Sequence, residues 1–188
     1  MNDSTELSRS LGELADPDLG KRAAAAARLH HEGASLCSSA TREWMKDPEF
    51  RALVRPGGCV VGIAVAPKSF DAIRAANGSP PLADVPPDQD AMEFELEIAG
   101  CHFDILTSRE PGGSGAIARY LQKFGAGIQQ IEINVSDVDR ASEILRARFA
   151  LAPVYPATRA GADGTRVNFF LAPADGKKAL IELVESPK

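Results

Sequence analysis

The chain has 188 residues, of which 44% are hydrophobic and 25% are charged, a composition typical of water-soluble globular proteins. Its net charge of −5 excludes a broad positive footprint for nucleic acid, and no apolar run approaches the ~20 residues needed to cross a bilayer. The N-terminal sequence lacks the basic start and apolar centre of a signal peptide. The three widely spaced cysteines argue against a disulfide framework or a zinc cluster. We therefore expect a cytoplasmic protein that contacts neither nucleic acid nor membranes.

Residues 1–56 are predicted to form a helical N-terminal extension. In its alanine-rich segment, Asp16 is the candidate N-cap of a helix and Gly33 is the stop signal. One or two further short helices follow, and the sequence RPGG at residues 55–58 then breaks the chain.

After this break the pattern changes to short alternating strands and amphipathic helices. The predicted elements, in chain order, are a strand at 59–65, a helix at 68–76, strands at 91–98 and 101–106 joined by a turn at Ala99-Gly100, a helix at 114–124, a strand at 128–135, a helix at 137–149, and strands at 154–159, 166–172 and 179–185.

This order describes an internal repeat, with a first module at 57–124 and a second at 125–188. Each module has a strand, a helix and then further strands, although the strand after the first helix is poorly marked. We predict an α+β fold in which two βαβββ modules form a curled mixed sheet around a cleft.

Alternation along the strands separates a packing face from a polar face. The polar face is predicted to carry Glu93, Asp104, Gln130, Glu132, Asn168 and Glu182. On the strand at 166–172, the residues predicted to pack are Val167 and Phe169. Val60 and Gln130 occupy the same place in the two modules, and so do Asp104 and Glu182.

The second module resembles the C-terminal half of methylmalonyl-CoA epimerase, a member of the vicinal oxygen chelate superfamily. The residues that carry this resemblance are GIQQIEINV, where the family has a paired-histidine HHI motif, and GTRVNFFLAPADGKKALIELVE near the C-terminus. The first module is more loosely similar through GIAV, VPPDQDAMEFEL and SGAIARYLQK. The resemblance covers about residues 59–186 and implies the paired-module fold.

In the family a divalent metal is held by four side chains, and the matching positions here are Val60, Asp104, Gln130 and Glu182. Val60 cannot bind a metal, and Gln130 offers a neutral oxygen where the family has an imidazole. Two alternatives stay open. One is a divalent ion such as Mg, Mn or Co in an oxygen-rich site of Asp104, Gln130 and Glu182, and the other is no metal at all.

The resemblance also implies the acid–base groups. The base of the family matches Glu93, and Glu182 is the second acidic candidate for moving the proton between a thioester and a carboxylate. Val60, Gln130, Glu132 and Asn168 are the predicted substrate-binding residues. The run of Glu93, Glu95 and Glu97 has a plainer interpretation too, as the solvated face of a strand.

Three functions are open at this point. The first is an epimerase, isomerase or lyase that acts on an acyl-CoA or another small carboxylate, and retention of Glu93 favours it. The second is a metal-free protein that binds a small molecule, as in the bleomycin-resistance branch. The third is a degenerate scaffold whose N-terminal helices contact a partner. We prefer the first and expect a homodimer, as the resemblance implies.

Overall fold

The computed structural model describes residues 3–187 and has an α+β fold divided into two compact units. Unit 1 consists of the residues up to 32 and of 61–129, and unit 2 consists of 33–60 and of the residues from 130 onward. The chain changes unit within three elements, which are α2 (Leu19–Thr41), β1 (Val54–Ala64) and β4 (Gly127–Val135).

Unit 1 contains a sheet with the strand order β2-β3-β1, in which β1 and β3 are parallel and β2 and β3 antiparallel. Besides the parts of α2, β1 and β4 that belong to it, this unit contains α1 (Asp3–Glu13), α4 (Pro67–Ala76), η2 (Pro87–Gln89), β2 (Ala91–Ile98), β3 (Cys101–Ser108) and α5 (Ala116–Phe124).

The predicted β2–β3 hairpin is confirmed. Ala99 and Gly100 both have positive φ, as a two-residue turn of this kind requires, and Ile98 pairs with Cys101 directly beside it. The packing face predicted for these strands is also confirmed, since Phe94 and Phe103 are fully buried.

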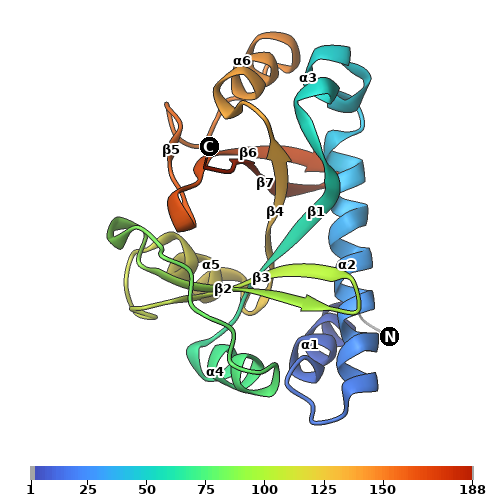
Figure 1. Ribbon diagram of the computed structural model, residues 1–188, viewed down its shortest axis with the longest axis vertical. Helices are drawn as coiled ribbons and strands as arrows, with labels where there is room; N and C mark the ends of the chain where they lie inside the picture. The colour runs from blue at the N-terminus through green and yellow to red at the C-terminus, as the bar shows by residue number, and fades with distance from the viewer. Residues whose placement is uncertain (1–2, 188) are drawn as a thin grey trace. The chain divides into compact units, whose positions relative to one another are not determined.

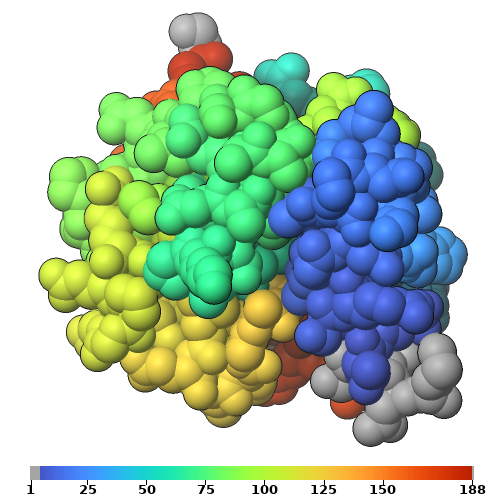
Figure 2. All heavy atoms as spheres, turned by 90° about the horizontal axis from the view of Figure 1, so that it is seen from below, coloured from blue at the N-terminus to red at the C-terminus, as the bar shows by residue number. Residues whose placement is uncertain are grey.

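The N-terminal helices pack on the rest of unit 1. Figure 1 shows α1 beside the first turns of α2, where Arg28 donates to the Ser10 hydroxyl at 3.0 Å. Figure 2 shows these helices, in blue, beside α4, in green. There the Asn77 side-chain amide donates to the Leu14 carbonyl at 3.0 Å, so a side chain just after α4 fixes the α1–α2 loop.

The boundaries predicted for the long helix were wrong at both ends. Asp18, not Asp16, caps α2, because its carboxylate accepts from the Lys21 backbone N–H at 3.0 Å. Asp16 instead accepts from the Asp18 backbone N–H in the preceding turn. Gly33 lies inside α2, which continues to Thr41, and the cost of about 1 kcal/mol for an interior glycine is tolerated there.

Unit 2 contains the strand order β4-β7-β6-β5, in which β4 and β7 are parallel and the other pairs antiparallel. Figure 1 shows α6 beside β6 and β7. The elements of this unit besides β4 are η1 (Trp44–Lys46), α3 (Pro48–Leu53), α6 (Val138–Phe149), β5 (Arg159–Ala160), η3 (Ala162–Gly164), β6 (Arg166–Ala174) and β7 (Lys177–Glu185).

Two further predictions are corrected in unit 2. The RPGG sequence does not break the chain but lies within β1, where Gly57 and Gly58 adopt positive φ. The strand predicted at 154–159 is reduced to β5, Arg159–Ala160.

None of the helices among residues 3–187 is both long and apolar enough to span a membrane.

The strand register agrees with the predicted repeat at one pairing in each unit. In unit 1, Gly62 pairs with Asp104 between β1 and β3, and in unit 2, Glu132 pairs with Glu182 between β4 and β7. Gly62 lies two residues after Val60, and Glu132 lies two residues after Gln130. These two pairings occupy positions that the predicted repeat makes equivalent, and the bounds of the two modules stay a prediction.

Candidate functional site

The predicted site residues fall into two groups, one in each unit. Glu93 and Asp104 belong to unit 1, and Val60, Gln130, Glu132, Asn168 and Glu182 belong to unit 2. Their convergence in one cleft stays a prediction. Within each unit, however, the geometry of the group is defined.

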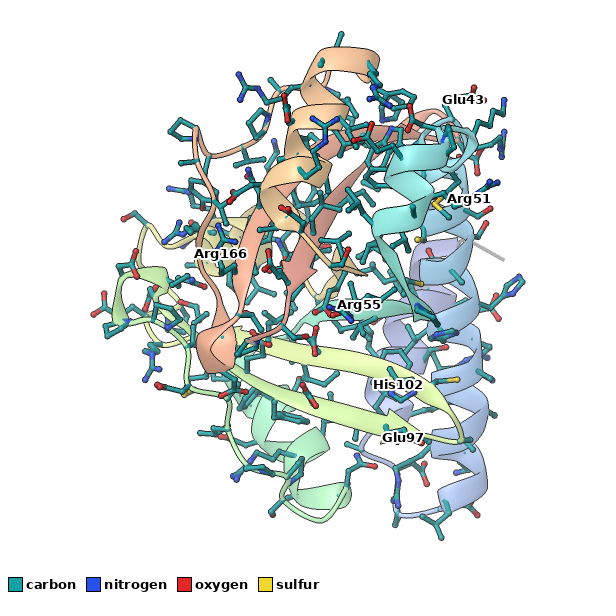
Figure 3. The ribbon with its side chains drawn as sticks, turned by 45° about the horizontal axis from the view of Figure 1, so that its top comes forward. Glu43, Arg51, Arg55, Glu97, His102 and Arg166 are labelled. Atoms are coloured by element: carbon teal, nitrogen blue, oxygen red, sulfur yellow. The ribbon has the colours of Figure 1, made fainter. Side chains whose placement is uncertain are left out.

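In unit 1, one face of the β2–β3 hairpin is rich in carboxylates. The register pairs Glu95 with Asp104 and Glu97 with His102, so these side chains share a face. Figure 3 shows Glu97 and His102 together near the turn of this hairpin, where both are exposed. Glu93 lies on the same face and is half-buried, and Asp104 is only 5% exposed. The two predicted site residues of this unit are thus the least exposed acids of the face.

In unit 2, the central feature is a hydrogen bond from the Gln130 side-chain amide to the Glu182 carboxylate. Both side chains are only 8% exposed. They are adjacent because parallel pairing places Ile131 beside Ile181 and Glu132 beside Glu182. A neutral amide donor therefore stands beside a buried carboxylate, at the position where the family has a metal-binding histidine.

The polar face of β4 continues beyond this pair. The Asn134 amide donates to the Glu132 carboxylate at 2.8 Å, and both side chains are half-buried. Gln130, Glu132 and Asn134 thus form a stripe of hydrogen-bonding groups along one side of the strand, as the alternation predicts.

The predicted face of Asn168 was wrong. Asn168 pairs with Leu183, and Phe169 pairs with Glu182, so Phe169 shares the face of the carboxylate. Asn168 is 3% exposed on the other face, where its amide donates to the Ser142 hydroxyl of α6 at 3.3 Å. A structural role in fixing α6 therefore replaces the predicted substrate contact.

Aromatic residues that alternation alone did not select lie beside Glu182. Phe169 makes an edge-to-face contact with Tyr155 at 5.9 Å between ring centroids, and the Arg159 guanidinium lies 4.5 Å from the Tyr155 centroid. The sequence feature that could have placed Phe169 on the face of Glu182 is the turn at Asp175 and Gly176. A two-residue turn there fixes the β6–β7 register and places Phe169 opposite Glu182.

Arg166 forms hydrogen bonds with one carboxylate at the end of β7 and one in the first turn of α6. It donates to Glu185 at 3.1 Å and to Asp139 at 2.5 Å. Glu185, which is buried, also accepts from the Val138 backbone N–H at 3.0 Å, so it fixes the start of α6. The side-chain hydrogen bonds from Thr158 and Arg166 hold the pKa of Asp139 below its usual value.

The side chains present do not fit the metal site of two histidines and two oxygen ligands that the resemblance implies. Val60 has no donor atom, and Gln130 turns an amide N–H, which cannot bind a cation, toward Glu182. Within residues 3–187, no group of three or more His, Cys, Asp and Glu side chains is placed to hold a metal ion. An oxygen-rich site that includes Asp104 stays a prediction. Carboxylates and amides are the chemical groups that the chain itself supplies.

Comparison with known proteins gives a consistent result at the level of structure. No family model and no curated protein matches the chain. The crystal structure of methylmalonyl-CoA epimerase from Mycobacterium tuberculosis is similar at 30% identity, with 68% of this chain and 86% of that chain covered and a TM-score of 0.54.

Two further structures are similar at 25% identity. One is a methylmalonyl-CoA epimerase of which 93% is covered, together with 68% of this chain, at a TM-score of 0.54. The other is a variant of the Streptomyces coelicolor enzyme in complex with 2-nitronate-propionyl-CoA, of which 99% is covered, together with 72% of this chain, at a TM-score of 0.55. The chain therefore belongs to the vicinal oxygen chelate superfamily, as a relative of methylmalonyl-CoA epimerase.

Proposed function

We propose that this protein is a proton-transfer enzyme of the epimerase type, which acts on an acyl-CoA or another small carboxylate through Glu93 and Glu182. The observation that carries the proposal is the buried Gln130–Glu182 hydrogen bond, since it retains an oriented carboxylate where the family has one. The similarity to the Mycobacterium tuberculosis epimerase supports the same reaction class.

The reaction removes the acidic proton between a thioester and a carboxylate and returns a proton to the same carbon. One of the two glutamates takes the proton as general base, and the other donates one as general acid. The Gln130 amide restricts the orientation of the Glu182 carboxylate, so less freedom is lost when the transition state forms.

A second role follows for Gln130. Its amide nitrogen carries two N–H groups, and one of them bonds Glu182. The other can donate to the oxygen on which negative charge develops as the proton leaves. A neutral donor of this kind stabilises the developing charge less than a metal would, and we therefore expect a slow enzyme.

The test is deuterium exchange from heavy water into methylmalonyl-CoA, measured by mass spectrometry with the purified protein. Glu93→Gln and Glu182→Gln should each abolish exchange. Glu95→Gln is the matched control, because Glu95 lies on the same strand face but is exposed, and it should exchange like the wild type. A wild type that exchanges no deuterium would overturn the proposal for this substrate.

The same assay, run with chelator and with added Mn²⁺, separates the two metal alternatives. Exchange that persists in chelator supports the metal-free mechanism. Exchange that appears only with Mn²⁺ supports the oxygen-rich site of Asp104, Gln130 and Glu182 instead, and Asp104→Asn should then abolish it.

The second candidate function is metal-free binding of a small molecule without chemistry. Val60, which has no donor atom at a family ligand position, favours it. In that case the CoA thioester raises the melting temperature of the protein but exchanges no deuterium.

We also propose that the protein forms a homodimer. Light scattering on the purified chain tests this directly.

A further inference from the structure

Within unit 2, the first residues of β1 lie beside the end of β4. The Ser136 backbone N–H, just after β4, donates to the Leu53 carbonyl, just before β1, at 2.8 Å, and the two strands are neighbours in the sheet. Because the start of one strand meets the end of the other, the two strands run antiparallel. Counting two residues along each strand from this hydrogen bond places Arg55 of β1 opposite Asn134 of β4. Opposite residues of an antiparallel pair point to the same face of a sheet, so these two side chains share a face.

This face is the one that carries the proposed catalytic carboxylate of unit 2. Asn134 alternates along β4 with Glu132 and Gln130, and the Gln130 amide donates to Glu182 of β7. The register that pairs Glu132 with Glu182 puts both carboxylates on the same side. Arg55 therefore shares a sheet face with Glu182, and two strand spacings, about 10 Å, separate their strands.

The guanidinium of Arg55 is not engaged within the protein. Arg55 is exposed, and none of the hydrogen bonds and ion pairs among residues 3–187 involves its side chain. In the same unit, Arg140, Arg148 and Arg166 form ion pairs, and the guanidinium of Arg159 lies over an aromatic ring. Arg55 thus retains all its side-chain donors for an anion from solution.

The backbone next to Arg55 is open to a ligand. Gly57 and Gly58 have positive φ, a conformation that strands use in bulges, where the twist changes and a side chain is turned to a new direction. Apart from the adjoining residues of the chain, no described residue lies within 4 Å of a Cβ atom placed at either glycine. A small molecule can therefore approach β1 beside Arg55.

We propose that Arg55 binds the free carboxylate of the substrate. The inference rests on the proposed function, because it assigns a second contact to the molecule from which Glu182 moves a proton. A substrate carboxylate that approaches this face is repelled by Glu132 and Glu182, and the positive charge of Arg55 offsets the repulsion. A guanidinium also donates two parallel hydrogen bonds to a carboxylate, which orients the group as well as binding it.

The phosphates of CoA are the other anions that the same molecule could present to a guanidinium. The substrate carboxylate is attached to the carbon that loses its proton, whereas the phosphates lie at the far end of the long pantetheine arm. Because Arg55 and Glu182 extend from one face of neighbouring parts of the sheet, the carboxylate is the anion that both can reach in one acyl group. Arg55 is thus a substrate-binding residue and does not itself move the proton. It also lies outside residues 59–186, which carry the resemblance to the family.

The experiment measures the binding of three probes to the purified full chain by calorimetry. The probes are methylmalonyl-CoA, its analogue with a carboxamide in place of the carboxylate, and CoA alone. Arg55→Gln should weaken the binding of methylmalonyl-CoA about tenfold or more and leave the other two dissociation constants unchanged. Arg55→Lys keeps the charge but not the paired donors, so its affinity for methylmalonyl-CoA should lie between those of the wild type and Arg55→Gln.

Arg51→Gln is the matched control. Arg51 is also an exposed arginine of unit 2, four residues earlier in the chain, and Figure 3 shows it on α3, well apart from Arg55 on β1. It should bind all three probes like the wild type. In the deuterium-exchange assay, Arg55→Gln should raise KM by the same factor as the dissociation constant and change kcat little, because the contact is made before and during proton transfer.

Four binding results contradict the proposal. The first is an unchanged affinity of Arg55→Gln for methylmalonyl-CoA, and the second is an equal loss in Arg51→Gln. The third is an equal loss for all three probes, which would assign Arg55 to a CoA phosphate instead. The fourth is a wild type that binds methylmalonyl-CoA no more tightly than CoA. Binding that depends on Arg55 without any deuterium exchange would refute the proposed function alone, so the two failures are distinguishable.

Discussion

The side-chain amide of Gln130 donates a hydrogen bond to the carboxylate of Glu182, and both groups are more than nine-tenths buried. Parallel pairing of β4 and β7 produces this contact, since it places the two residues on the same face of neighbouring strands. A buried carboxylate is costly without donors, so the amide contributes to stability as well as to the proposed chemistry.

Replacing Gln130 with Ala should lower the free energy of unfolding by about 1–3 kcal/mol, because the buried carboxylate of Glu182 loses a donor. Urea denaturation measures this change. A double-mutant cycle with Glu182→Gln isolates the pair, because Gln130→Ala should cost less in that background. Equal costs in both backgrounds would show that the hydrogen bond contributes nothing.

Local signals predicted the β2–β3 hairpin and most elements because the physics that sets them is local. Ala99-Gly100 and Asp175-Gly176 form two-residue turns, and each fixes the register of its strands. The polar stripe of Gln130 and Glu132 follows from strand alternation alone. These features need no knowledge of the rest of the chain.

The failures have a different origin. Gly33 is a helix stop by propensity, but Ala40 and Thr41 are buried, and their packing continues α2 past the glycine. Asn168 was placed by alternation within its own strand. The register set by the Asp175-Gly176 turn puts it opposite Leu183 instead, so combining the turn with the alternation would have identified Phe169 as the neighbour of Glu182.

A metal site should be recoverable by restoring the two missing imidazoles. We expect Val60→His combined with Gln130→His to bind Co²⁺ at least tenfold more tightly than the wild type, since imidazole is a far better ligand than an amide or a methyl group. The visible absorbance of bound Co²⁺ and calorimetry measure the affinity.

The matched control for this gain is Val60→His combined with Gln129→His. Gln129 is adjacent to Gln130 but points to the other side of β4, so its imidazole cannot join Glu182. Equal Co²⁺ affinity in the two double variants would mean that the positions taken from the family do not form a site in this chain.

Acid should weaken the contact between α3 and α6. The hydrogen bond from Arg148 lowers the pKa of Asp47 from 3.8, and that from Arg140 lowers the pKa of Glu49 from 4.5. Because the folded pKa values are depressed, the stabilisation is complete above the unfolded values and is lost as the pH falls through the folded ones. The variant Arg140→Gln with Arg148→Gln should therefore be less stable than the wild type above about pH 5, and the difference should shrink below it.

Chemical denaturation at several pH values measures this difference, and raising the salt concentration should reduce it because Arg140, Arg148 and Glu49 are partly exposed. Arg146→Gln is the control, since Arg146 lies on the same helix and on an exposed part of it. A stability difference that does not change between neutral and acidic pH would contradict the assignment of the effect to Asp47 and Glu49.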